Sequence, residues 1–531
     1  MLGAEIVADR LIAHGVDTVF GYPGAAILSV YEALWWRKEK IRHILVSHEQ
    51  HAAHAADGYA RSRGTVGVCL ATSGPGATNL LTGIATAALD SSPVLAITAN
   101  VATTALGKDS FQEIDIVGLT MPIVKHSWLV KTVDELAFVI EEAFIVAQAR
   151  RPGPVLIDIP YDVLESEGTM TNNLETARIK RLRTNSSVER VRGIEEAQAL
   201  IVKAARPLIY AGGGIIRAQA QAELLSLAEH LDAPVALSLM GTAAFPRSHR
   251  LCLGTIGLMA QPSPQEAFLR EADLIIALGT RFSDRTLRHN PFNKNNKTAK
   301  ILHCDSDDAE INKNIRADLS LVADLKTIIP LLTQQIPPRA AQHVPAPFPE
   351  EPDNVPRTVI TQCAQKIGNN AIVVTDVGQH QLWTIQYYPF DGNTQCVTSG
   401  GLGTMGFGLG AAIGAQCANP HRPVVLFTGD GSFRMNCAEL ATVAAYQIPI
   451  LIIVFNNHAL GLVKTWQDIR YEGRYSETIL KRPPDFVKLS AAYQIPGFRA
   501  DTESAYIRAL DAAMPLLNNH TAVLIEVLVE S

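Results

Sequence analysis

The stretch from residue 424 to residue 466 constrains the fold of this chain more than any other. Two apolar runs, residues 424–427 and 448–455, have the length of buried strands, and a segment with helical character (438–446) lies between them. In an α/β sheet, two parallel strands joined by a crossover helix bring their carboxyl ends to the same sheet edge. The sequence therefore predicts a βαβ unit whose two strand ends lie side by side.

Both predicted strands end in residues that suit a metal ion and a phosphate group. Gly429, Asp430 and Gly431 follow the first strand, and Asn456 and Asn457 follow the second. A carboxylate and an amide oxygen are hard ligands that suit Mg²⁺, which usually completes its shell with phosphate oxygens and water. Glycines also let backbone N–H groups approach a phosphate. Asp430 and Asn457 are therefore the candidate magnesium ligands, although a plain βαβ unit with a glycine turn has a similar pattern.

The composition fits a large α/β protein with no nucleic-acid or membrane partner. A chain of 531 residues allows about three domains, and its apolar content is 47%. The net charge of −6 gives no reason to expect binding to nucleic acid or to an anionic membrane. Seven scattered cysteines without a CxxC pair predict reduced thiols. No signal peptide is recognisable and the apolar runs are only strand-sized, so we expect a cytoplasmic protein.

Alternating helix and strand patterns predict an α/β fold with three doubly wound parallel-sheet domains. The predicted domains are residues 1–165, 190–335 and 357–531. A polar segment separates the first two, and a proline-rich segment separates the last two. The central domain contains a run of glycines at 212–214, which lacks the GxGxxG spacing of a dinucleotide site. The first and third domains are alike in pattern only.

Glu49 lies where a predicted strand of the first domain meets a predicted helix. The preceding His48 does not begin an HExxH zinc motif, because position 52 is an alanine. A glutamate in the first turn of a helix is favourable in itself. The position of Glu49 alone therefore indicates no function.

The GDG turn followed, after a helix and a strand, by Asn-Asn resembles the cofactor motif of thiamine-dependent enzymes. Many further matches in the same order make the chain similar to the catalytic subunit of acetohydroxyacid synthase (acetolactate synthase) over almost all its length. They are YPG (22–24), SHEQ (47–50), ADGYAR (56–61), TSGPGATN (72–79), FQE (111–113), KHSWLV (125–130), RPGPV (151–155), GTRFSDR (279–285), DVGQHQ (376–381), SGGLGTMGFGL (399–409), GDGSFRMN (429–436) and NNHALGLVKTWQD (456–468). The FQE, TMGFGL and VKTWQD segments point to this family rather than to other thiamine enzymes.

The resemblance implies roles for residues in the first and third domains. Glu49 would hydrogen-bond the aminopyrimidine ring of the cofactor, so that its exocyclic nitrogen can take the proton from the thiazolium carbon. Asp430, Asn457 and the carbonyl of Ala459 would bind Mg²⁺. The other thiamine diphosphate contacts would come from Gly378, Gln379, His380, Gly403, Met405, Gly431, Ser432 and Val463. Met405 would be the apolar wedge that bends the cofactor, although core packing is the alternative for a buried methionine.

The resemblance also implies a substrate channel. Phe111 and Gln112 would line it next to the reacting groups. Trp466 would favour 2-ketobutyrate as acceptor, and Arg285 would hold the acceptor carboxylate, for which a guanidinium is well shaped. A core aromatic residue and a surface ion pair are the alternatives for these two positions.

A structural FAD is a further expectation from the resemblance. The positions that resemble flavin contacts are Arg151, Arg281, Asp305 and Asp324. A GLMA run at 257–260, where the family has a GMHG-like run, argues against a flavin site.

The chain departs from the family pattern at several further positions. Ala25 replaces a glycine, Asn100 a glutamine, Tyr161 a lysine and Gly410 a proline. The sequence ends at Ser531, where family members continue in a tail that folds over the active site. From this end and from the shorter Asn100 we expect more water access and more release of aldehyde.

The predicted function is decarboxylation of pyruvate on thiamine diphosphate and transfer of the two-carbon unit to a second 2-keto acid, as in branched-chain amino acid biosynthesis. The alternatives are a thiamine-dependent 2-keto acid decarboxylase, a carboligase with a different acceptor, and a non-catalytic homologue. The intact Glu49, Asp430 and Asn457 argue against the last. In the family, Glu49 and the metal motif come from different subunits, so we expect a homodimer or tetramer. A small regulatory subunit is left open.

Overall fold

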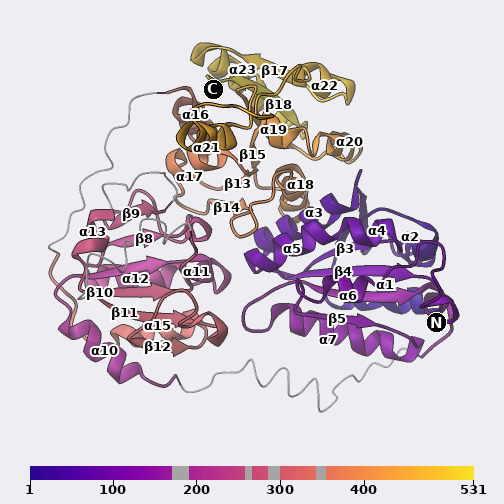
Figure 1. Cartoon of the computed structure of the whole chain (residues 1–531), viewed down its shortest axis with the longest axis horizontal. Helices are drawn as coiled ribbons and strands as arrows, with labels where there is room; N and C mark the ends of the chain where they lie inside the picture. Colours follow the sequence, from indigo (N-terminus) through magenta and orange to yellow (C-terminus); the bar gives the residue numbers. More distant parts are fainter. Residues whose placement is uncertain (170–190, 258–265, 285–298, 342–353, 531) are drawn as a thin grey trace. The chain divides into compact units, whose positions relative to one another are not determined.

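The computed structural model describes residues 1–169, 191–257, 266–284, 299–341 and 354–530, and they form two compact units. The first unit takes in residues 1–186, 371–381 and 397–531, and the second takes in residues 187–370 and 382–396. Three parallel six-stranded sheets with helices on their faces make up the described fold (Figure 1). This confirms the predicted fold class.

The N-terminal sheet belongs to the first unit and has the strand order β2-β1-β3-β4-β6-β5. Its strands are β1 (Thr18–Gly21), β2 (Arg42–Leu45), β3 (Gly67–Ala71), β4 (Val94–Asn100), β5 (His126–Leu129) and β6 (Val155–Pro160). Its helices are α1 (Gly3–Ala13), α2 (Leu28–Trp35), α3 (Glu49–Arg63), α4 (Pro75–Asn79), α5 (Leu81–Asp90), α6 (Ile116–Thr120), α7 (Leu136–Gln148) and α8 (Tyr161–Glu165). The inner strands β3, β4 and β6 are buried at every position. Burial on both faces explains their continuous apolar runs.

The C-terminal sheet has the order β14-β13-β15-β16-β18-β17. Its strands are β13 (Ile372–Thr375), β14 (Gln395–Thr398), β15 (Val424–Gly429), β16 (Ile450–Asn456), β17 (Gly497–Ala500) and β18 (Val523–Leu528). Its helices are α17 (Gln379–Tyr387), α18 (Gly408–Ala418), α19 (Asp430–Phe433), α20 (Leu440–Ala445), α21 (Gly461–Tyr471), α22 (Phe486–Ala492) and α23 (Glu503–Asn518). Counted from its own first strand, this is the strand order of the N-terminal sheet. The first and last sheets therefore share a topology, and not only a pattern.

The central sheet belongs to the second unit and has the order β12-β11-β10-β7-β8-β9. Its strands are β7 (Pro207–Ala211), β8 (Val235–Leu237), β9 (Cys252–Thr255), β10 (Leu274–Leu278), β11 (Lys300–Asp305) and β12 (Leu319–Val322). The helices of this unit are α10 (Ile194–Lys203), α11 (Gly213–Arg217), α12 (Gln221–Leu231), α13 (Glu266–Glu271), α15 (Leu325–Thr333) and α16 (Val355–Ile367). Counted from β7, the order is that of dinucleotide-binding sheets.

Within the first unit, α3 packs directly on α18 (Figure 1). A Cβ atom on Gly58 would lie 2.1 Å from the carbonyl oxygen of Ala411, and one on Gly414 would lie 1.8 Å from that of Ala55. Only glycine permits so close an approach of two backbones. The two glycines therefore set the distance between the helices.

We expect Gly58→Ala and Gly414→Ala each to destabilise the protein by roughly 1–3 kcal/mol or more, because the new methyl group meets a backbone carbonyl that cannot rotate away. Urea unfolding of each variant measures the loss. Gly153→Ala is the control, since its Cβ would meet only the flexible side chain of Lys125, at 3.0 Å. Equal losses in all three variants would contradict this account of the helix contact.

Candidate active site

The metal motif lies at the ends of two neighbouring parallel strands. Gly429 of β15 is paired with Phe455 of β16, so Asp430 and Asn457 follow adjacent strand ends. The predicted βαβ unit is thereby confirmed. The intervening chain is divided into α19, a short 3₁₀ helix (Cys437–Glu439) and α20, where the sequence predicted one helix.

The Asp430 carboxyl group is suited to a cation. It is only 1% exposed, its Oδ2 atom has no hydrogen-bond partner, and burial raises the pKa of Asp430 to about 6. Leaving a buried charged oxygen without a partner costs free energy. A bound cation would remove that cost.

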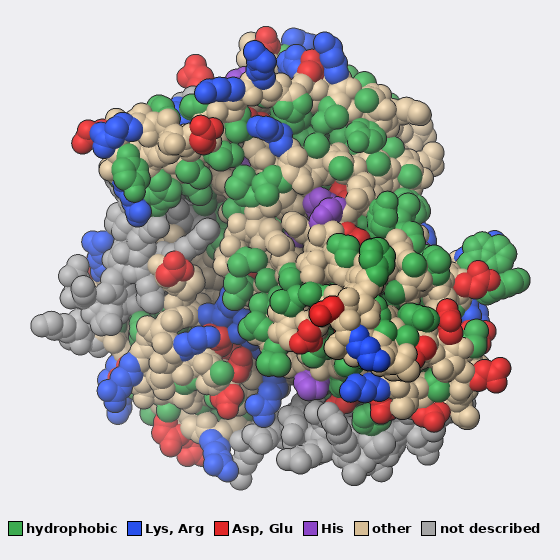
Figure 2. Space-filling model, turned by 45° about the vertical axis from the view of Figure 1, so that its right-hand side comes forward, with side chains coloured by type: hydrophobic (Ala, Val, Ile, Leu, Met, Phe, Trp, Pro, Cys, Tyr) green, Lys and Arg blue, Asp and Glu red, His purple; other side chains and the backbone are tan. Residues whose placement is uncertain are grey.

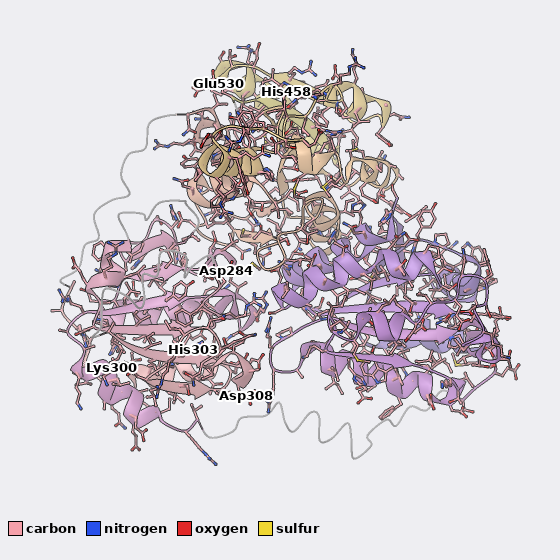
Figure 3. All side chains as sticks on the ribbon, in the orientation of Figure 1. Asp284, Lys300, His303, Asp308, His458 and Glu530 are labelled. Atoms are coloured by element: carbon pink, nitrogen blue, oxygen red, sulfur yellow. The ribbon has the colours of Figure 1, made fainter. Side chains whose placement is uncertain are left out.

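Asn457 and Ala459 lie in the turn that follows β16. The Asn457 Oδ1 atom accepts a hydrogen bond from the Ala459 backbone at 3.2 Å, and its Nδ2 atom donates to Gln379 Oε1 at 3.2 Å. His458 between them, labelled in Figure 3, has a left-handed φ of 55° that turns the chain. A carboxylate, an amide and a carbonyl oxygen fit Mg²⁺. Among the residues described, no cluster of three His, Cys, Asp or Glu side chains could hold a metal ion.

The start of α17, which follows β13, brings His380 against the GDG segment. A Cβ on Gly378 would lie 2.7 Å from the imidazole Cε1 atom, and one on Gly429 would lie 2.7 Å from Nδ1. Burial lowers the pKa of His380 to about 3, so the ring is neutral at physiological pH. The nearby Ser432 hydroxyl donates to the Val377 carbonyl at 2.9 Å. Predicted diphosphate residues from the two strand ends are thus brought together.

The loop between β14 and α18 brings Met405 next to Gly431 of the metal motif. A Cβ on Gly431 would lie 3.8 Å from the Met405 methyl group. Gly403 in this loop has a left-handed φ of 72°. Val463 and Trp466 lie on α21, which begins four residues after Asn457. On this helix the Arg470 guanidinium lies 4.5 Å from the centre of the Trp466 ring.

Glu49 is the first residue of α3, in the N-terminal half of the first unit. Its Oε2 atom accepts a hydrogen bond from Asn79 Nδ2 at 2.9 Å, and its Oε1 atom lies 3.2 Å from the Cβ position of Gly76. The carboxylate therefore faces the TSGPGATN segment, which follows β3 and contains α4. His48 caps the helix by accepting from the Gln50 backbone at 3.2 Å.

Glu439, which no sequence motif singles out, fixes the start of α3. Its fully buried carboxylate accepts from the backbone of Ser47 at 2.9 Å and of His48 at 3.2 Å, and it lies 2.9 Å from Nδ1 of His51. The only sequence signal is an acid within an otherwise apolar segment, nine residues after Asp430.

Phe111 and Gln112 lie in the loop that follows β4. Gln112 has a φ of 59°, and its Cα atom lies 2.9 Å from the Cβ position of Gly74, while Phe111 is 87% exposed. Glu113 shapes this loop by accepting from the backbones of Ser110 at 2.9 Å and Lys108 at 3.3 Å and from that of Gly107. The structure therefore places Gln112 and Glu49 on the same turn after β3.

Asn100, the last residue of β4, is held by hydrogen bonds to its own sheet, and its expected effect on polar support near the substrate stays a prediction. It is 4% exposed, its Nδ2 atom donates to Asp158 Oδ2 at 2.6 Å, and its Oδ1 atom accepts from the Val101 backbone at 2.8 Å. Burial raises the pKa of Asp158 to about 6. The amide thus anchors the start of the Phe111 loop within the domain.

Comparison with known proteins agrees with this geometry. Family models match in order: the N-terminal TPP binding domain of thiamine pyrophosphate enzymes at residues 1–119, their central domain at 194–332, and their C-terminal TPP binding domain at 376–527. The chain is 39% identical to the acetolactate synthase isozyme 3 large subunit of Escherichia coli over 99% of its own length and 95% of that protein. It is 42% identical to an acetolactate synthase of Arthrospira platensis, over 96% of its length and 92% of the relative. It is 43% identical to a probable acetolactate synthase large subunit of Methanocaldococcus jannaschii, over 94% of its own length and 87% of that protein.

The chain belongs to the acetolactate synthase family of thiamine pyrophosphate enzymes.

Membership in this family confirms the resemblance found in the sequence, the enzyme class and the thiamine diphosphate cofactor. The roles of individual residues and the domain boundaries stay predictions. Among the described helices, none is long and apolar enough to cross a membrane.

The predicted flavin residues have structural contacts of their own. Arg151 Nε donates to Ser91 Oγ at 2.7 Å, the Arg281 carbonyl accepts from Asn314 at 2.9 Å, and Asp324 caps α15 by accepting from the Lys326 backbone at 2.9 Å. Asp305 ends β11 and accepts from the Asp307 backbone at 2.9 Å. Arg285 and residues 258–260 lie outside the described residues.

A glycine-rich turn occupies the switch point of the central sheet, between β7 and β10. A Cβ on Gly212 would lie 2.1 Å from the Gly279 carbonyl oxygen, and one on Gly214 would lie 2.6 Å from Gly279 Cα. His303 on β11, labelled in Figure 3, lies 2.9 Å from the carbonyl oxygen of Thr280, beside this turn. Ligands of such sheets bind at this edge. The position of the glycines therefore supports a ligand site more strongly than their spacing in the sequence did.

We expect Asp430→Asn to stabilise the cofactor-free protein above about pH 6, by roughly 1–3 kcal/mol. The fold raises the pKa of Asp430 from 3.8 to about 6. It therefore favours the protonated carboxyl group, and stability is lost as the pH rises between these two values. The neutral amide avoids this loss.

Urea unfolding of wild type and variant with EDTA, between pH 4.5 and pH 7.5, checks the prediction. With Mg²⁺ and thiamine diphosphate present, the order should reverse at pH 7.5, because the variant loses a metal ligand. A cofactor-free variant that is less stable than the wild type at pH 7.5 would contradict the assignment.

Proposed function

We propose that this protein is an acetolactate synthase that decarboxylates pyruvate and joins the remaining two-carbon unit to a second 2-keto acid, in the biosynthesis of branched-chain amino acids. The observation that carries the proposal is that Glu49, Asp430 and Asn457 are all present at strand ends suited to their roles. The alternative is a 2-keto acid decarboxylase, which shares these residues.

The residues that would take part in the reaction come from both sheets of the first unit. Bound thiamine diphosphate supplies the electron sink for decarboxylation. Asp430, Asn457 and the Ala459 carbonyl would hold Mg²⁺ and through it the diphosphate, which Gly378, Gln379 and His380 would also contact. Met405 would set the bend of the cofactor. Glu49 would hold a proton at the pyrimidine nitrogen, as a carboxylate kept in place by Asn79 can do.

We propose that the active unit contains at least two copies of the chain, with Glu49 of one copy facing the metal motif of the other. Exposed apolar side chains support this arrangement: Phe111 lies beside Gln112, Met435 beside Gly406, and Ile469 on the helix of Trp466. Figure 2 shows hydrophobic side chains at many points of one face. Apolar surface that gathers near a site is typical of a surface that another chain covers. Since relatives are named large subunits, a smaller partner subunit is also proposed.

Product analysis tests the reaction. With pyruvate, thiamine diphosphate and Mg²⁺, we expect acetolactate as the main product by chromatography. Glu49→Gln should lower turnover by about 10²-fold or more, because it removes a general acid–base group, while cofactor binding is retained. Acetaldehyde as the only product, or wild-type turnover in Glu49→Gln, would contradict the proposal.

Trp466→Leu in the same assay separates acceptor choice from decarboxylation. The variant should consume pyruvate normally but lose preference for 2-ketobutyrate over pyruvate as acceptor, because the aromatic wall is gone. An unchanged product ratio would remove Trp466 from the acceptor site.

We propose in addition that the central domain binds FAD in a structural role. Its strand order and the glycine turn at its switch point support a dinucleotide site. Protein incubated with FAD and desalted should keep flavin absorbance. A colourless protein would overturn this part of the proposal, and acetolactate synthesis would be unaffected by that result.

A further inference from the structure

Asp376 is a buried carboxylate at the end of β13 that is surrounded by N–H donors. Its Oδ1 atom accepts from the backbones of Val377 at 2.8 Å and Gly406 at 2.9 Å. Its Oδ2 atom accepts from the Gly408 backbone at 3.0 Å and from Asn436 Nδ2 at 3.2 Å. The side chain is fully buried. Hydrogen bonds to a charged acceptor are stronger than those between neutral groups.

These four donors come from three segments that the cofactor site uses. Val377 begins the diphosphate loop, the segment that leads into Gln379 and His380 at the start of α17. Gly406 directly follows Met405 and Gly408 begins α18, while Asn436 lies six residues after Asp430. One carboxylate therefore joins the diphosphate loop, the Met405 loop and the segment that follows the metal motif.

The Met405 loop needs such an anchor because it has no helix or strand of its own between β14 and α18 and is rich in glycine. Glycine-rich segments lose much conformational entropy when they are ordered. The part of the loop before Met405 is held by Asp90, which accepts from the Gly401 backbone at 2.6 Å, and by Thr86, whose hydroxyl lies 2.7 Å from that of Thr404. The segment from Met405 to Gly408 is held by Asp376.

We propose that Asp376 is a positioning residue that sets the place of Met405 relative to the diphosphate loop, and so the affinity for thiamine diphosphate. The proposal rests on the cofactor roles proposed above for Met405 and Asp430. It assigns to Asp376 an effect on cofactor binding without direct contact with the cofactor.

An amide cannot replace this carboxylate, since all four neighbours are N–H donors. In Asp376→Asn, one orientation turns the new NH₂ group toward Val377 and Gly406. The other turns it toward Gly408 and Asn436. Asn436 can then rotate to present its Oδ1 atom, which has no partner at present. Even so, the Gly408 N–H loses its acceptor, and the end of the Met405 loop is loosened.

Titration of the full-length protein with thiamine diphosphate at fixed Mg²⁺, followed by tryptophan fluorescence, tests the proposal. Asp376→Asn should weaken binding by about tenfold or more, as expected when a buried donor loses its acceptor. Asn436→Ala, which removes one donor and keeps the backbone ones, should weaken it less, by about threefold.

Asp232→Asn is the matched control. Asp232 is likewise buried, belongs to the central sheet's unit and pairs with Arg250 at 2.7 Å. This variant should lose stability without any change in cofactor affinity. A purely structural role for Asp376 would reduce the amount of folded protein in the same way and leave the affinity of the folded fraction unchanged.

Affinity within twofold of wild type in folded Asp376→Asn overturns the proposal, as does equal weakening in the control. If Asp376→Asn does not fold, Asn436→Ala decides: unchanged affinity overturns the proposal, and weaker binding supports it. Asp430→Ala separates this result from the proposed function. Unchanged affinity in Asp430→Ala removes the metal assignment itself, whereas weakening there without weakening in Asp376→Asn removes only the role of Asp376.

Discussion

The backbone contact between α3 and α18 is the constraint on which the first unit depends. Each helix follows the second strand of its sheet, β2 or β14, and the two sheets have the same strand order. The start of α3 carries Glu49, and the start of α18 follows the Met405 loop. Because Gly58 and Gly414 let the two backbones touch, neither helix can slide without opening a gap or creating a clash. The helix pair therefore holds both loops that precede it.

Buried charges reinforce this contact. Arg61 of α3 pairs with Asp57 at 2.6 Å and with Asp90 at 3.0 Å, and it donates to the Thr398 carbonyl at 2.7 Å. Asp90 in turn accepts from Gly401. Breaking one member of such a network leaves an uncompensated buried charge. The N-terminal half of the chain thus helps to shape the loop that carries Met405 in the C-terminal half.

Local patterns were sufficient for the elements and for the residues at strand ends. Asp430 and Asn457 could be placed together from the sequence because apolar runs mark β15 and β16, and a crossover helix makes them parallel. Glu439 could not be found in this way. Its contact with Ser47 joins residues 392 positions apart, and no periodicity records such a pairing. The common topology of the first and last sheets was hidden for the same reason, since strand order is set by tertiary packing.

Asn100 shows a different limit, and it bears on the fate of the reaction. The sequence reveals that a glutamine of the family has become an asparagine, but it does not reveal where the side chain points. The structure shows that its amide is buried against Asp158, so the change from glutamine alters an internal contact of the first sheet. The balance between ligation and protonation then depends on how firmly the acceptor is oriented, which can supply several kcal/mol of the barrier. Trp466 is suited to that task because Arg470, one helical turn away, lies over its ring at 4.5 Å. A ring held in this way loses little entropy on binding, which is what the acceptor role proposed for Trp466 requires.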